Sequence, residues 1–134
     1  MQLSEFTVHD VAQFPEVRCA PETAYPGYAA QWRAELEALI ERGEPFFMLF
    51  AEGEFKEAQE DMRVRAVWLK ENKVTLAKLC RSIVSIESDA AKRAKLLEQL
   101  RGLEKAFGIP RLVASTESEG RVAGLESMSH NADN

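Results

Sequence analysis

Apolar and polar side chains alternate in two short segments near the start of the chain. The alternation covers residues 6–11 and returns over residues 16–20, with Phe14 and Pro15 between them. A period of two is typical of strands that bury one face. We therefore expect two strands paired as an N-terminal hairpin, with His9 on the polar, solvent-facing side.

Three later segments are apolar or β-branched without alternation. They are residues 46–50, between Pro45 and Gly53, residues 82–86 and residues 112–114. Short apolar runs bounded by turn residues indicate strands that are covered on both faces. These segments predict three more strands, and residues 46–50 should form a central one.

Apolar positions at helical spacing fill the intervals between these strands. The first helix should end near Arg42, because Gly43 favours the left-handed conformation and Pro45 cannot continue a helix. A second helical segment begins at Phe55 and breaks at Asn72, before a short helical piece that leads into the next strand. The expected inner positions are Tyr28, Trp32, Leu36, Leu39 and Ile40 in the first helix, and Phe55, Ala58, Met62, Ala66, Val67, Trp68, Leu69, Leu76, Leu79 and Cys80 in the second segment.

Two more helices are predicted in the C-terminal half. Ser88 or Asp89 caps the start of one by accepting a backbone N–H bond, and Gly108 ends it. Thr116 and Glu119 form a capping box for the other. The expected inner positions are Ala90, Ala94, Leu97, Leu100, Leu103 and Phe107 in one helix, and Val122, Leu125 and Met128 in the other.

The predicted order is two strands followed by alternating helices and strands. This order predicts an α/β fold: a single-layer, mixed, mostly parallel sheet with an N-terminal hairpin and about four helices. A chain of 134 residues has the size of one domain. We expect residues 1–128 to form that domain and residues 129–134 to be a disordered tail.

Composition adds little to this picture. Apolar residues make up 46% of the chain and charged residues 29%, as in ordinary globular proteins. The longest apolar run is too short to span a bilayer, and the first residues lack the basic and apolar regions of a secretory leader. Cys19 and Cys80 are too few and too distant for a disulfide framework or a zinc site. We therefore expect a cytoplasmic protein with reduced thiols.

Charge is distributed unevenly along the chain. Residues 1–62 carry 13 acidic and 4 basic side chains, whereas residues 63–111 carry 12 basic and 5 acidic ones, and the net charge is −5. This net charge argues against general nucleic-acid binding. A basic helix face is a candidate for contact with an acidic partner, or with the acidic half of a second copy in a homodimer, although solvation alone explains it. That face consists of Lys92, Arg93, Lys95, Arg101 and Lys105.

The element order and three segments resemble STAS-like bacterial proteins related to the anti-sigma-factor antagonists. The segments are residues 39–43 at a helix end, the strand at residues 46–50, and residues 68–70 with the strand at residues 83–86. The resemblance spans residues 6–128 and implies a regulatory binding module that recognises a protein partner or a small ligand and performs no catalysis. In phospho-regulated antagonists a serine begins the helix after the central strand. Residues 51–57 contain no Ser or Thr here, so the phospho-switch is not carried over.

Two features keep an enzyme of another type as an alternative. Cys80 lies beside Lys78 and Arg81, whose charges lower a thiol pKa. A cluster of acids also lies where a parallel strand ends and a helix begins, which is the position at which open sheets usually bind ligands. The carboxylate oxygens of such a cluster would suit a magnesium ion. The cluster consists of Glu52, Glu54, Glu57, Glu60 and Asp61. Burial of the thiol and the helix dipole explain both features more simply, so we expect no metal, no cofactor and no catalytic residue. A self-associating structural protein is the third alternative.

The candidate binding residues lie at helix starts and at the end of the central strand. Helix N-termini offer unpaired N–H groups to anions, although the sequence contains no glycine-rich phosphate loop. Ordinary capping accounts for the serines at these positions equally well. The candidates for ligand or partner contact are Glu52, Glu54, Ser88, Ser118, Lys92 and Arg93.

Overall fold

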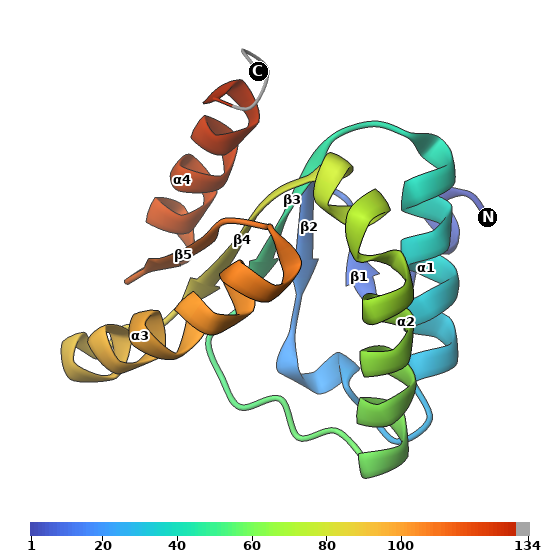
Figure 1. Cartoon of the computed structure of the whole chain (residues 1–134), viewed down its shortest axis with the longest axis horizontal. Coiled ribbons are helices and arrows are strands. Elements are labelled where there is room, and N and C mark those ends of the chain that lie inside the picture. The colour runs from blue at the N-terminus through green and yellow to red at the C-terminus, as the bar shows by residue number, and fades with distance from the viewer. Residues whose placement is uncertain (131–134) are drawn as a thin grey trace.

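The computed structural model describes residues 1–130 and shows an α/β fold, with one five-stranded sheet and helices on both of its faces (Figure 1). The strand order is β1-β2-β3-β4-β5; β1 pairs antiparallel with β2, and the other neighbours are parallel. This confirms the predicted mixed sheet with its N-terminal hairpin. The strands are β1 (His9–Asp10), β2 (Glu16–Cys19), β3 (Phe46–Phe50), β4 (Cys80–Ile86) and β5 (Arg111–Ala114); the helices are α1 (Ala29–Arg42), α2 (Gln59–Leu79), α3 (Ala90–Phe107) and α4 (Glu117–His130), with 3-10 turns at Leu3–Glu5 and Pro21–Thr23.

Strand β3 lies at the centre of the sheet, as its unbroken apolar run predicts. Phe46 and Met48 belong to the larger core, which includes residues of α1 and α2, whereas Phe47 and Leu49 belong to a second core beneath α4. Successive side chains of a strand point to opposite faces. Both faces of β3 are therefore buried, and this is why its sequence does not alternate.

Helices α1 and α2 pack side by side on one face of the sheet, and α3 lies against β5 near α2 (Figure 1). Trp32 of α1 and Trp68 of α2 meet edge to face, with their ring centroids 5.4 Å apart. Both indoles are buried, which confirms their predicted place in the core. Gly43 ends α1 in the left-handed conformation, with φ of 71°, as predicted.

Helix α4 covers the opposite face of the sheet and approaches it through glycine (Figure 1). A Cβ atom on Gly124 would lie 2.3 Å from the ring of Phe47, and one on Gly120 would lie 2.5 Å from Ile86 Cδ1. The prediction that Val122 and Leu125 face the sheet is wrong, because their side chains are 55% and 47% exposed. The two glycines allow the helix backbone itself to contact the sheet, so the bulky side chains turn outward.

Helix α2 differs from its prediction in start, continuity and orientation. It begins at Gln59 rather than Phe55, and it runs unbroken through Asn72. The amide of Asn72 donates to the carbonyl of Trp68 at 2.9 Å, so this side chain is satisfied inside the helix and no break is needed. Met62 and Val67, expected on the inner face, are 52% and 54% exposed.

Helix α3 presents a different stripe from the predicted one. Leu100 is buried and Leu96 is half-buried, whereas Leu97 and Leu103 are 41% and 42% exposed. Leucines occupy adjacent positions 96 and 97, so periodicity alone does not decide between the two rows. The remaining predicted inner positions Ala90 and Ala94 are exposed as well.

The C-terminal helix reaches further than expected. Ser129 and His130, placed in the tail by the sequence, are the last helical residues of α4. Residues 131–134 of the predicted tail lie outside the described residues.

Candidate functional site: a cavity between the sheet and helices α2 and α3

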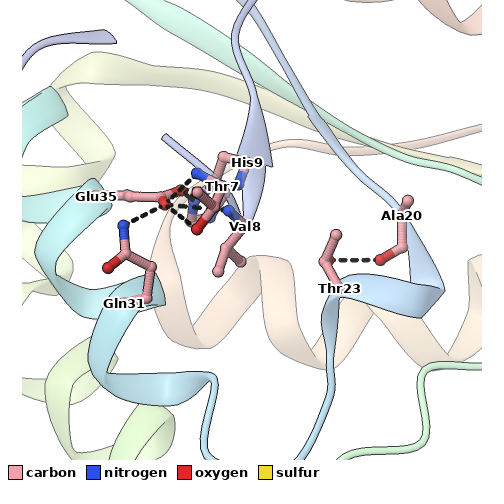
Figure 2. Close-up of polar contacts among 7 residues, drawn as sticks. All are labelled: Thr7, Val8, His9, Ala20, Thr23, Gln31 and Glu35. Atoms are coloured by element: carbon pink, nitrogen blue, oxygen red, sulfur yellow. Dashed lines mark hydrogen bonds and ion pairs between the residues drawn. The ribbon is translucent and has the colours of Figure 1, made fainter. Parts of the chain in front are cut away.

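A buried carboxylate anchors the N-terminal segment to α1. The side chains of Glu35 and His9 are both 0% exposed, and His9 Nδ1 lies 2.8 Å from Glu35 Oε1 (Figure 2). Because a carboxylate only accepts hydrogen bonds, Nδ1 must carry the proton. The expectation that His9 faces solvent is therefore wrong. The other donors to Glu35 are the backbone N–H groups of Thr7, Val8 and His9, at 2.7, 3.1 and 2.8 Å, and Gln31 Nε2 at 2.8 Å.

These donors decide the charge of Glu35. Burial is the largest influence and by itself raises the pKa of the carboxyl, but hydrogen bonds from His9, Thr7, Gln31 and Val8 together outweigh it and lower the pKa to about 2. Glu35 is thus ionised at neutral pH. Helical spacing offered a signal for this position, because Glu35 lies three residues after Trp32 and four before Leu39, on the buried face of α1.

His9 also contributes to the wall of a cavity of about 590 Å³. The cavity opens where strands β2, β3 and β4 end, beneath α2 and α3, and Cys19, Phe50 and Ile86 mark these three carboxyl ends. Open α/β sheets usually bind ligands at this edge, and the volume suits a small molecule. Further apolar wall residues are Val8, Ala24, Trp32, Ala51, Leu96 and Leu100.

One side of the cavity carries a closed polar network. Arg65 Nη1 lies 2.6 Å from Glu57 Oε1, and the guanidinium also lies over the ring of Trp32, 4.9 Å from its centroid. The hydroxyl of Tyr28 donates to the same carboxylate. Burial, followed by this hydrogen bond, raises the pKa of Tyr28, so the phenol remains protonated at neutral pH. Glu57 and Arg65 therefore neutralise each other's charge, although Arg65 Nε is buried without a hydrogen-bond partner.

Arg111 is different, because its charge has no counter-ion. It begins β5, is half-buried and lies on the cavity wall; its Nε is buried without a hydrogen-bond partner. Within residues 1–130, no carboxylate lies within ion-pair distance of its guanidinium. Burial lowers the pKa of Arg111. The sequence offered a weak signal for this residue, a charge directly before a predicted buried strand.

The structure brings several predicted binding residues to the rim of this cavity. Ser88 Oγ donates to Glu52 Oε2 at 2.7 Å, and the hydrogen bonds from Ser88, with the nearby charge of Lys92, lower the pKa of Glu52. Glu52, Glu54 and Lys92 all line the cavity. These residues come from the loop after β3 and from the start of α3, so side chains of these two segments lie together at the carboxyl end of β3.

Two other predicted residues have different surroundings. Arg93 Nη1 donates to the carbonyl oxygens of Glu87 and Ser88, at 3.0 and 2.8 Å, and so fastens the turn into α3. Ser118 lies in the first turn of α4, which covers the opposite face of the sheet, and is not on the cavity wall. Asp89 rather than Ser88 caps α3, accepting from the backbone N–H of Lys92 at 2.9 Å.

The acidic cluster does not assemble into one site. Asp61 accepts from the backbone N–H groups of Gly27 and Ala29, at 2.8 and 3.1 Å, while Glu60 pairs with Arg63. Glu52 and Glu57 have the separate partners described above. Among the residues that the structure describes, no three His, Cys, Asp or Glu side chains gather as metal ligands would.

The two thiols are buried and unpaired with each other. Burial raises the pKa of Cys80 to about 12 and also raises that of Cys19. A protonated thiol is a poor nucleophile. This argues against the thiol version of the enzyme alternative.

The site therefore consists of an apolar cavity, a closed Arg65–Glu57–Tyr28 network and one arginine without a counter-ion. No helix within the described part of the chain is both long enough and apolar enough to cross a membrane. No protein-family model, curated protein or solved structure matches this chain.

Proposed function

We propose that this chain is a cytoplasmic, STAS-like binding module of bacterial type that takes a small molecule into the cavity beneath α2 and α3 and performs no chemistry on it. The observation that carries the proposal is the cavity of about 590 Å³ at the carboxyl ends of three parallel strands. The order of elements, a hairpin followed by alternating helices and strands, supports the STAS-like part of the proposal.

The polar groups around the cavity favour binding over catalysis. A general base needs a proton-accepting atom within reach of the substrate. Glu35 is saturated with donors, Glu57 accepts from Arg65 and Tyr28, and His9 Nε2 is buried away from solvent. The wall therefore offers shape, apolar surface and charge.

A neutral apolar fluorophore tests this function. N-phenyl-1-naphthylamine gains fluorescence when it leaves water, and titration should give saturable binding of one molecule per chain. Leu96 lines the cavity, whereas the neighbouring Leu97 is 41% exposed on α3 and does not. Leu96→Trp should narrow the cavity and weaken binding, while the matched control Leu97→Trp should leave it unchanged.

Two results would contradict the proposal. Wild-type protein that shows no saturable binding would exclude a small-molecule cavity of this kind. Equal binding by the Leu96→Trp and Leu97→Trp variants would place the probe elsewhere on the surface. Both variants must keep a cooperative thermal transition, so that a loss of binding is not a loss of fold.

Self-association is the second candidate, and exposed leucines on α3 favour it. Leu97 and Leu103 are 41% and 42% exposed on a helix that also carries Lys95 and Arg101. A second copy would cover these leucines and offer its acidic N-terminal half to the basic side chains. Sedimentation velocity should then show a dimer that weakens with salt and with Leu97→Glu; a monomer at all concentrations would exclude this candidate.

A further inference from the structure

Arg111 is a half-buried cation on the cavity wall, and its acidic neighbour Glu104 forms no ion pair with it. The carboxylate of Glu104 is close enough to influence Arg111 electrostatically, but its Oε1 accepts from the backbone N–H of Arg111 at 2.7 Å. The guanidinium itself has no ion pair within the described residues, and its Nε has no hydrogen-bond partner. A charge removed from water without a partner is costly, so an anion at this position would recover a large part of that cost.

The other charged groups around the cavity do not share this property. Arg65 is paired with Glu57, and Glu52 accepts from Ser88. Lys92 is exposed at the rim, where water solvates its charge. Arg111 is therefore the side chain of the wall at which a ligand would meet a half-buried charge without an ion-pair partner.

The surroundings also restrict the size and charge of that anion. The cavity lining carries four carboxylates against three basic side chains, Arg65, Lys92 and Arg111, so it has no excess positive charge for a molecule that carries several negative charges. The remaining wall is largely apolar, from Val8 in the N-terminal segment to Leu100 in α3. A single anionic group on an aromatic or aliphatic body fits both features, whereas a polyphosphate does not. The four carboxylates belong to Glu52, Glu54, Glu57 and Glu87.

We infer that the ligand of this cavity is an amphipathic monoanion, whose carboxylate, sulfonate or similar group pairs with the guanidinium of Arg111 while its apolar body lies between the sheet and α3. This inference rests on the proposed binding function and names the chemical class of its ligand. Arginine recognises such oxyanions through two parallel N–H donors, which fixes the orientation of the ligand as well as its affinity.

Two probes that share one skeleton separate this inference from the proposed function. 8-Anilinonaphthalene-1-sulfonate is N-phenyl-1-naphthylamine with one added sulfonate, so the pair differs in the anionic group. Wild-type protein should bind the sulfonate at least about tenfold more tightly than the neutral probe. Arg111→Met should remove that preference, so that the variant binds the two probes with affinities within about twofold of each other.

Two further variants control for charge and for folding. Arg101→Met removes the same charge from an exposed position on α3 and should leave both affinities unchanged. Arg111→Lys should keep part of the preference, because it retains the cation but loses the two-donor geometry. Arg111→Met should melt at the wild-type temperature or above it, because an apolar side chain replaces a half-buried charge that has no ion pair.

The outcomes are distinguishable. Failure of both probes to bind wild-type protein overturns the proposed function and this inference together. Binding of the neutral probe without a preference for the sulfonate, or a preference that survives Arg111→Met, overturns the inference alone. A preference that is lost equally in Arg101→Met would assign it to general surface charge and would also overturn the inference.

Discussion

His9 Nδ1 donates to Glu35 Oε1 over 2.8 Å, and this contact joins the first strand of the sheet to the first helix in a fully buried position. The same carboxylate accepts the backbone N–H groups of Thr7, Val8 and His9. One side chain of α1 thus satisfies three consecutive backbone donors that no neighbouring strand reaches. The geometry explains how a strand of two residues, β1, holds the edge of the sheet beside the cavity.

Glu35→Gln should therefore destabilise the fold strongly. The substitution removes a charge that receives five N–H donors and the hydroxyl of Thr7, and it places an amide NH₂ among N–H groups that need acceptors. We expect a loss of about 2–4 kcal/mol in the free energy of unfolding, measured by urea denaturation. Glu41→Gln, at an exposed position of the same helix, should change it by less than about 0.5 kcal/mol. Similar values for the two variants would show that the His9–Glu35 contact contributes little.

The same carboxylate predicts a specific acid sensitivity. The pKa of Glu35 falls from its usual 4.5 to about 2 on folding. A lowered folded-state pKa stabilises the protein fully above the unfolded value, and this contribution is lost as pH falls from about 4.5 toward 2. The difference in unfolding free energy between wild type and Glu35→Gln should therefore shrink over this range. If this difference in unfolding free energy is the same at about pH 5 and about pH 2.5, the lowered pKa of Glu35 is contradicted.

The close approach of α4 to the sheet predicts opposite effects of one substitution at two glycines. Gly124→Ala would place a methyl group 2.3 Å from the ring of Phe47, whereas nothing lies within 4 Å of a Cβ at Gly102 in α3. Thermal unfolding should show a loss of at least about 1–3 kcal/mol for Gly124→Ala, from overpacking. Gly102→Ala should gain about 0.5–1 kcal/mol, because alanine is the better helix former. Equal effects at the two positions would argue against the packing of α4.

Asp61 of α2 caps the start of α1, so replacing Asp61 should lower the free energy of unfolding more than replacing a neighbouring acid does. Its two carboxylate oxygens accept from the backbone N–H groups of Gly27 and Ala29. Asp61→Ala should lower the unfolding free energy by about 1–2 kcal/mol, since an unpaired buried N–H group remains. Glu60→Ala removes an exposed ion pair with Arg63 one residue earlier and should cost less than about 1 kcal/mol. The contrary result, a larger cost at Glu60, would exclude the cap.

Both thiols should be unreactive in the folded protein. Cys19 and Cys80 are buried, and burial raises the pKa of each, to about 12 for Cys80. An aromatic disulfide reagent at pH 8 should react with neither thiol at a measurable rate in the native state, and with both in urea. Rapid reaction of one native thiol would revive the alternative in which Cys80 is a nucleophile.

Local signals in the sequence were sufficient for the order of the elements. The apolar run of β3, the left-handed Gly43 after α1 and Gly108 after α3 each act within a few residues. The sequence also placed Glu52 at the end of the central strand and Ser88 and Lys92 around a helix start, but their contact with one another is seen in the structure alone. These features depend on backbone chemistry and on the pattern of neighbouring residues, both of which can be read directly from the sequence.

Tertiary contacts decided which side chains are buried and which remain without a partner. His9 is buried because Glu35 reaches it from 26 residues away, and α4 turns Val122 outward because its glycines lie against Ile86 and Phe47. Arg111 stands out because α3 and β5 enclose it while Glu104 binds its backbone instead of its guanidinium. The sequence by itself determined an α/β chain with a mixed sheet, but the cavity and its unpaired cation arise from long-range packing, in which side chains contact partners that are near in space but distant along the chain.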